Sequence, residues 1–141
     1  MFKPELEVPS LELCKKLKSL EYPQNGGGWY WSVDNQGRVF LSFFQKMTNE
    51  DIEHDEKINF LKRIKAPTVR ELGEFFPSEV TCFRDFKRGF LCEYENRQEN
   101  VAQSFWEDTE ANARAKMLIW LIENGYVRFE NERMYKNFKK S

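Results

Sequence analysis

The sequence predicts an α+β domain in which an antiparallel sheet of four to five strands carries about three packed helices. Three observations predict this class. Two pairs of runs rich in aromatic and β-branched residues are each separated by a short polar turn that contains glycine. Three segments with helical periodicity each follow a Ser or Thr that can cap a helix. No apolar stretch reaches the roughly 20 residues that a membrane span requires.

Length and composition favour one globular unit. The chain has 141 residues, of which 40% are hydrophobic and 16% aromatic, and we expect a single domain over residues 1–141. Lys and Arg total 22 against 23 Asp and Glu, so the net charge of -1 gives no general attraction to nucleic acid or to an anionic membrane. The first residues lack the pattern of a signal peptide, and we expect a cytoplasmic protein.

The three cysteines, Cys14, Cys82 and Cys92, are odd in number and form no CxxC motif. This pattern disfavours both a disulfide framework and a cysteine-based zinc site. Cys82 and Cys92 could face each other across a hairpin, but free cysteine commonly behaves as a small hydrophobic residue. We therefore expect buried free thiols.

The first third of the chain predicts one helix and one hairpin. Apolar residues recur at helical spacing after Ser10, the expected N-cap, and the helix should end near Tyr22 because proline and three glycines follow. Residues 29–33 and 38–44 then read as two strands, with a polar turn at residues 34–37.

Residues 48–65 admit two interpretations. Thr48 and Asp51 have the spacing of a capping box, with Asp in place of Glu or Gln, which favours a helix, but an insertion or long loop with a short apolar anchor fits the same residues. His54, the only histidine, lies among these acidic residues, and a metal-dependent enzyme built around it is the weaker functional alternative. We expect a solvated charged face there, with no metal and no cofactor.

The rest of the chain gives stronger signals. Thr68 and Glu71 have the spacing of a capping box, and Pro77 ends the short helix that follows. Residues 80–86 and 90–94 predict a second hairpin, and residues 101–106 a fifth strand. Either Asp108 or Thr109 should cap a helix over residues 109–124 that is buried nearly all round in its second half. A charged tail over residues 130–141 follows.

Two groups of residues are candidates for binding. Trp29, Tyr30 and Trp31 are candidate partner-binding residues, because a sheet buries both faces of such a run only under a covering layer; packing in the core is the alternative.

The second group consists of Arg84, Lys87, Arg88 and Phe90, which interleave basic and aromatic side chains on the second hairpin as nucleic-acid-binding sheets do. Cys92 stands where an RNA-recognition motif has an aromatic residue, which weakens that alternative.

Catalytic motifs are missing from the sequence. It contains no GxSxG, HExxH, GxxxxGK or GxGxxG pattern, and the Gly26–Gly28 run precedes a strand rather than a helix. An enzyme is therefore the minority interpretation. We expect a protein that acts by binding another protein; the sequence identifies neither that partner nor the oligomeric state.

Three segments, in this order, resemble a group of small, largely uncharacterised proteins encoded by bacteriophages and prophages. They are LKSLEYPQ at residues 17–24, KAPTVRELGE at residues 65–74, and TEANARAKMLI with LIEN at residues 109–119 and 121–124. The resemblance implies a phage or prophage origin. Together with the missing catalytic motifs, the near-neutral charge and the many aromatic residues, it leads us to expect an accessory protein in the cytoplasm of a bacterial host, with a host process as one candidate target. It implies no catalytic residues.

Overall fold

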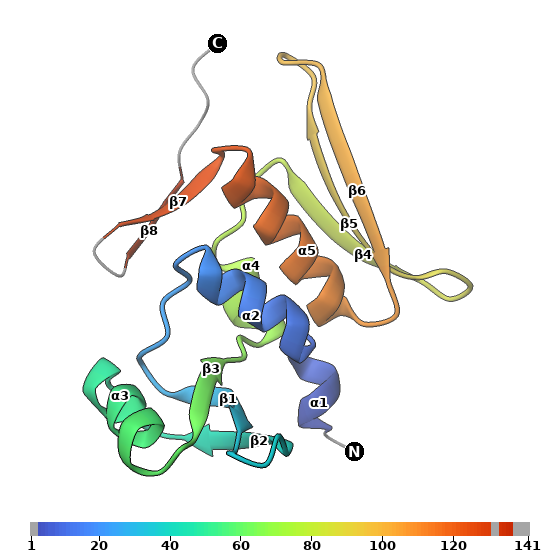
Figure 1. Ribbon diagram of the computed structural model, residues 1–141. Helices are drawn as coiled ribbons and strands as arrows, with labels where there is room; N and C mark the ends of the chain where they lie inside the picture. The colour runs from blue at the N-terminus through green and yellow to red at the C-terminus, as the bar shows by residue number, and fades with distance from the viewer. Residues whose placement is uncertain (1–2, 131–132, 137–141) are drawn as a thin grey trace.

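Two three-stranded antiparallel sheets lie on either side of a pair of helices in the computed structural model, which describes residues 3–130 and 133–136 (Figure 1). The first sheet has the strand order β2-β1-β3, the second has β4-β5-β6, and β7 and β8 form a separate pair. The elements are, in chain order, α1 Pro4–Glu7, α2 Leu11–Ser19, β1 Gly28–Val33, β2 Val39–Phe44, α3 Asn49–Ile58, β3 Lys62–Lys65, α4 Val69–Gly73, β4 Val80–Asp85, β5 Gly89–Asn96, β6 Val101–Glu107, α5 Glu110–Glu123, β7 Val127–Glu130 and β8 Arg133–Lys136.

The α+β class and the antiparallel pairing are as the sequence predicts, but the single sheet of four to five strands is wrong. The predicted hairpins form two separate sheets, and the described residues contain five helices rather than about three. The physical reason is β3, a strand of sequence Lys-Arg-Ile-Lys that pairs with the free edge of β1. It occupies the position through which the second hairpin would have joined the first.

Residues 48–65 form a helix and a strand rather than a loop. The Thr48 side chain accepts a hydrogen bond from the Asp51 N–H, and the Asp51 carboxylate accepts one from the Thr48 N–H, so the capping box is complete. Arg63 on β3 then donates to Asp55 on α3 at 2.9 Å. The helix is thereby attached to the first sheet. Of the predicted charged tail, residues 131–132 and 137–141 lie outside the described residues.

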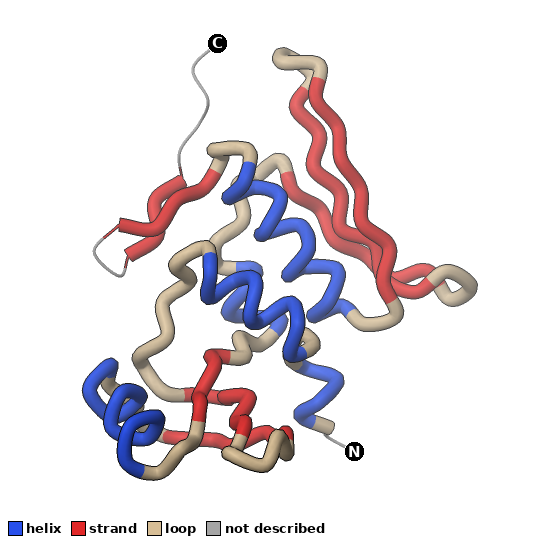
Figure 2. Tube along the Cα trace, viewed as in Figure 1, coloured by secondary structure: helices blue, strands red, loops and turns tan. Residues whose placement is uncertain are grey.

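Helix α5 is the centre of the main core. Thr109 caps the start of the helix, where its side chain accepts a hydrogen bond from the Asn112 N–H, and Asn124 caps the end. Both limits are close to the predicted ones. Met117, Leu118 and Leu121 are completely buried. The helix packs on β5 and β6 on one side and on α2 and α4 on the other (Figure 2).

Helix α2 connects the main core to the first sheet. It packs against both α5 and β3, and Leu17 is buried in the same cluster as Leu118. At its start, the Ser10 N–H donates to the Asn112 side-chain oxygen at 2.9 Å, a contact across 102 positions of the chain. A helix near the start of the chain and a helix in its last third are therefore joined in one core.

Cys82 and Cys92 form a disulfide, so the prediction that they are free thiols is wrong. They occupy directly opposed positions of β4 and β5, with Cα atoms 4.2 Å apart. Opposed residues at this spacing in an antiparallel pair have their side chains on the same face of the sheet. Cys14 is buried and free, as predicted.

Candidate functional site

The three predicted partner-binding residues on β1 are built into the interior to different degrees. Tyr30 is completely buried, and its hydroxyl donates to the Gln24 carbonyl at 2.6 Å. Trp31 is half-buried, and its indole N–H donates to the Pro9 carbonyl at 2.9 Å. Trp29 is half-buried beside Phe43. Tyr30 therefore has no exposed surface for a partner.

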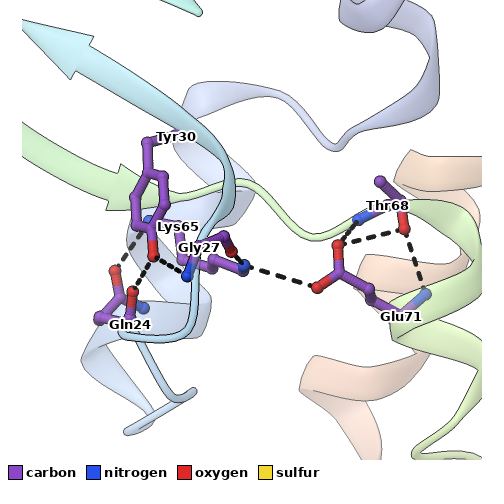
Figure 3. A network of polar contacts seen from close by, with 6 residues as sticks. All are labelled: Gln24, Gly27, Tyr30, Lys65, Thr68 and Glu71. Carbon is purple, nitrogen blue, oxygen red and sulfur yellow. Dashed lines mark hydrogen bonds and ion pairs between the residues drawn. The ribbon is translucent and has the colours of Figure 1, made fainter. Parts of the chain in front are cut away.

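A buried lysine organises the loop that precedes β1 (Figure 3). Only 6% of the Lys65 side chain is exposed, and its ammonium group donates to the Gly27 carbonyl and lies 5.2 Å from the centre of the Tyr30 ring. The Lys65 N–H donates to the Gln24 side chain at 2.8 Å. Burial raises the pKa of Tyr30 to about 12, against the opposing effect of the Gly27 hydrogen bond, so its hydroxyl remains protonated at neutral pH.

Glu71 supplies the countercharge to Lys65 from the neighbouring helix. One carboxylate oxygen lies 3.5 Å from the Lys65 ammonium, and the other accepts from the Thr68 N–H at 3.1 Å in the predicted capping box. Gly27 has a φ of +85°, and a Cβ there would lie 2.5 Å from the Gln45 carbonyl oxygen. The network thus fixes a turn that only glycine can form. The charged groups of Lys65 and Glu71 are directed at each other.

The acidic segment around His54 offers no metal site in the part of the chain that is described. No group of three or more His, Cys, Asp or Glu side chains is placed there to hold an ion. Asp51 caps α3, and Asp55 accepts from Arg63 and Asn59. The His54 side chain is exposed on the helix surface.

The four predicted nucleic-acid-binding residues separate into two environments. Arg84, Lys87 and Arg88 are exposed at the β4–β5 turn. Phe90 is partly buried and packs against the main core. All three cations lie at or beside one turn, but Arg84 is paired with Phe90 and its guanidinium lies 5.6 Å from the centre of that ring, whereas Arg88 lies beside Trp106. The predicted stacking ring itself is directed toward the core.

Other aromatic side chains accompany these cations. Phe86 belongs to the same run of basic and aromatic residues in the sequence, whereas Phe83 and Trp106 were not singled out by the sequence interpretation. Phe86 is 92% exposed at the turn, Phe83 is 51% exposed and Trp106 is 38% exposed. The strand register places Phe83 opposite Leu91 and Leu91 opposite Trp106, on the face of the second sheet that α5 does not cover. We call Phe83, Arg84, Phe86, Lys87, Arg88 and Trp106 the tip surface.

The tip surface has a defined local structure. The Asp85 carboxylate accepts hydrogen bonds from the Lys87 N–H at 2.8 Å and the Arg88 N–H at 3.3 Å, which closes the turn. The Arg84 guanidinium lies 5.2 Å from the Phe86 ring centre, and that of Arg88 lies 5.7 Å from Trp106. The sequence predicts a strand over residues 80–86, but β4 ends at Asp85 and Phe86 belongs to the turn.

A second exposed apolar feature lies at the end of α3. Phe60 is 62% exposed, and with Val33, Asp34, Asn35, Glu56 and Lys62 it lines a pocket of about 380 Å³, which we call the α3 pocket. Phe60 has a φ of +54°, a conformation that costs a bulky side chain roughly 1–2 kcal/mol. The helix-end position that it occupies is usually glycine or asparagine.

Comparisons with known proteins give no indication of what these surfaces bind. Among the described residues, no helix has the length and apolar character needed to cross a membrane. No family model, curated protein or solved structure matches this chain.

Proposed function

We propose that this chain is a non-enzymatic binding protein whose tip surface contacts a protein partner. The observation that carries the proposal is Phe86, a large apolar side chain with 92% of its surface exposed at the end of a projecting hairpin. Arg84 lies beside the Phe86 ring, and Arg88 lies beside the Trp106 ring. Aromatic residues and arginine are the residue types most enriched at the energetic centres of protein interfaces.

The rigidity of the hairpin supports this proposal. The cross-strand pairing of β4 with β5 and the Asp85 hydrogen bonds hold the turn before any partner arrives. A partner that binds an ordered hairpin loses less conformational entropy than one that must order a flexible loop. Exposed aromatic surface on a rigid support is the arrangement that favours affinity.

The biological setting belongs to the proposal as well. We infer a phage or prophage accessory protein that acts on a host process in the bacterial cytoplasm. This inference is supported by the three motif segments, by the missing catalytic motifs and by the near-neutral charge of -1.

Single-stranded nucleic acid is the second candidate partner. Arg84, Lys87 and Arg88 could hold phosphates while Phe86 and Trp106 stack on bases, as in other sheet-based readers. Glu93, however, lies on the same open face, opposite Ser104 on β6, and adds a repulsive charge. This balance makes a protein the better supported partner.

Capture from lysate of cells that carry the gene tests the proposal. The full chain and its Phe86→Ser variant are immobilised, and Phe43→Ser serves as the control because Phe43 is 61% exposed on the other sheet. We expect a protein that is retained by the wild type and by Phe43→Ser, survives nuclease treatment, and is lost with Phe86→Ser. Equal retention by all three would contradict a role for the tip surface.

Binding of labelled oligothymidine and oligouridine tests the alternative that the partner is single-stranded nucleic acid. For nucleic acid, affinity should fall steeply with salt and disappear in the Lys87→Glu, Arg88→Glu double variant. Salt-dependent binding that needs these two residues, without a nuclease-resistant protein partner, would replace the first proposal with the second.

A further inference from the structure

We propose that copies of this chain associate head to tail, with the tip surface of one copy seated in the α3 pocket of the next. In this arrangement Phe86 enters the pocket beside Phe60, and the cations of the turn face the acidic surface of α3. The inference rests on the proposed binding role of the tip surface and names the chemistry of its partner: an apolar pocket at the end of an acidic helix.

The backbone of Phe60 is the first support for the pocket as an interaction site. Phe60 adopts the left-handed conformation although glycine would adopt it without strain, and its ring is 62% exposed rather than used in the core. Ile58, two residues earlier, is 61% exposed. A strained backbone that leaves most of an aromatic ring outside the core is accounted for if the ring contacts another molecule.

Charge complementarity identifies the occupant. Helix α3 exposes Glu50, Glu53 and Glu56, and Glu56 lines the pocket. The tip surface exposes Arg84, Lys87 and Arg88, while the nearby Asp85 carboxylate is occupied by backbone N–H groups of the turn.

The pocket also has basic neighbours. Lys62 lines it beside Glu56 and Asp34, and Asp34 is paired with Arg38, so the charges of the lining nearly balance. The acidic surplus lies along the exposed side of α3, where Glu50, Glu53 and Glu56 outnumber Lys57. An exposed ring among cations therefore matches a pocket of about 380 Å³ that borders an acidic helix.

The positions of the two surfaces determine the kind of assembly. Helix α3 and the β4–β5 turn lie on opposite sides of the molecule in Figure 1, and Phe86 is exposed in the single chain. One copy therefore cannot fill its own pocket. A contact between two different surfaces repeats from copy to copy and produces open chains, or rings when the rotation closes.

Sedimentation of the full chain at increasing concentration tests this arrangement. We expect the weight-average mass to rise to about twice that of one chain or more at high concentration, and to fall back when salt is added. A wild type that keeps the mass of one chain throughout would overturn the inference.

Two charge-reversed variants make the test specific. Lys87→Glu with Arg88→Glu places negative charge on the tip, and Glu53→Lys with Glu56→Lys places positive charge at the pocket. Each variant alone should have the mass of one chain, because tip and pocket then repel each other. Mixed in equal amounts they should assemble, since each tip now meets a pocket of opposite charge. A mixture in which both variants remain single chains contradicts the proposed pairing.

Two further substitutions separate docking from folding. Phe60→Gly removes the ring and relieves the backbone strain, so we expect a melting temperature roughly 2–6 °C higher together with loss of assembly. Glu12→Lys, which lies on α2 away from the pocket, makes the same charge change as one of the pocket substitutions. This variant should assemble like the wild type. Phe60→Gly that assembles like the wild type would show that the α3 pocket is not the docking site.

These outcomes can be told apart from those of the proposed function. If the wild-type chain does not self-associate but still captures a protein through Phe86, head-to-tail assembly is wrong and the proposed function stands. If the variants assemble as expected but no other protein is captured, the tip surface serves self-association and the proposed function is wrong.

Discussion

The ammonium group of Lys65 on β3 lies 3.5 Å from the carboxylate of Glu71 on α4, and this ion pair joins the first sheet to the helices of the main core. The same ammonium group holds the carbonyl of Gly27 in the turn before β1. A single buried side chain therefore connects three segments of the fold.

Replacing Lys65 should destabilise the protein mainly through the turn. Lys65→Met retains the volume but leaves the buried Gly27 carbonyl without its donor, so we expect a loss of about 1–3 kcal/mol in urea unfolding. Glu71→Gln is the matched control: it keeps an acceptor for the Thr68 cap, and the Glu71 carboxylate is already 37% exposed, so its cost should stay below about 1 kcal/mol. Equal losses for the two variants would refute this division of roles.

The Asp55–Arg63 pair should make stability depend on pH. Partial burial opposes ionisation of Asp55, but hydrogen bonds from Arg63 and Asn59 and the Arg63 charge outweigh it, so the pKa of Asp55 lies below its usual value. The unfolded chain binds this proton at about pH 3.9. The stabilisation by ionised Asp55 is therefore complete above that pH and is lost as the pH falls through the lower folded pKa.

Asp55→Asn provides the measurement. The variant should unfold more easily than the wild type by a constant amount between about pH 5 and 7, and the difference should shrink below about pH 4. Chemical unfolding followed by circular dichroism at several pH values gives the difference in the free energy of unfolding in both pH ranges. A difference as large at pH 3 as at pH 6 would show that ionisation of Asp55 does not stabilise the fold.

The cross-strand disulfide should stabilise the second sheet. Cys82 and Cys92 are separated by 10 positions, and closing a loop of this size in the unfolded chain corresponds to about 2–3 kcal/mol. We expect a reducing agent to lower the free energy of unfolding by that amount. The double variant Cys82→Ser, Cys92→Ser should not respond to the reductant, and a wild type that is equally insensitive would contradict the prediction.

Leu118 tests the importance of α5. The side chain is completely buried in the main core, and Leu118→Ala should cost about 2–5 kcal/mol because it leaves a cavity. Glu12→Ala, on the exposed side of α2, should stay within about 0.5 kcal/mol of the wild type. A melting temperature for Leu118→Ala within about a degree of the wild type would contradict the central position of this helix.

Local structure could be predicted from the sequence because its signals are local. Thr48 and Thr68 accept the N–H groups of Asp51 and Glu71, as their capping-box spacing predicts. The helix predicted at residues 109–124 is present, and Thr109 is the one of its two candidate caps that accepts an N–H group. Both hairpins form at the predicted places. Caps and turns depend on residues within a few positions of one another, which is the range that sequence patterns describe.

The sheet arrangement and the exposed surfaces depend on distant residues. Nothing in the strand Lys-Arg-Ile-Lys indicates that Arg63 and Lys65 become buried, since their partners Asp55 and Glu71 come from two different helices. Alternation along residues 90–94 separates Phe90 from Leu91 but does not say which face α5 covers. Phe83 and Trp106 could therefore not be identified as exposed, nor Phe90 as packed on the core.

The hydrogen bond between Ser10 and Asn112 also has a consequence for the making of the protein. During synthesis, helix α2 leaves the ribosome about a hundred residues before the segment of α5 against which Leu17 packs. Contacts so distant in sequence form late and slow the folding of a domain. The part of α2 around Leu17 thus remains unburied until late in translation, and the main core closes only after α5 has emerged.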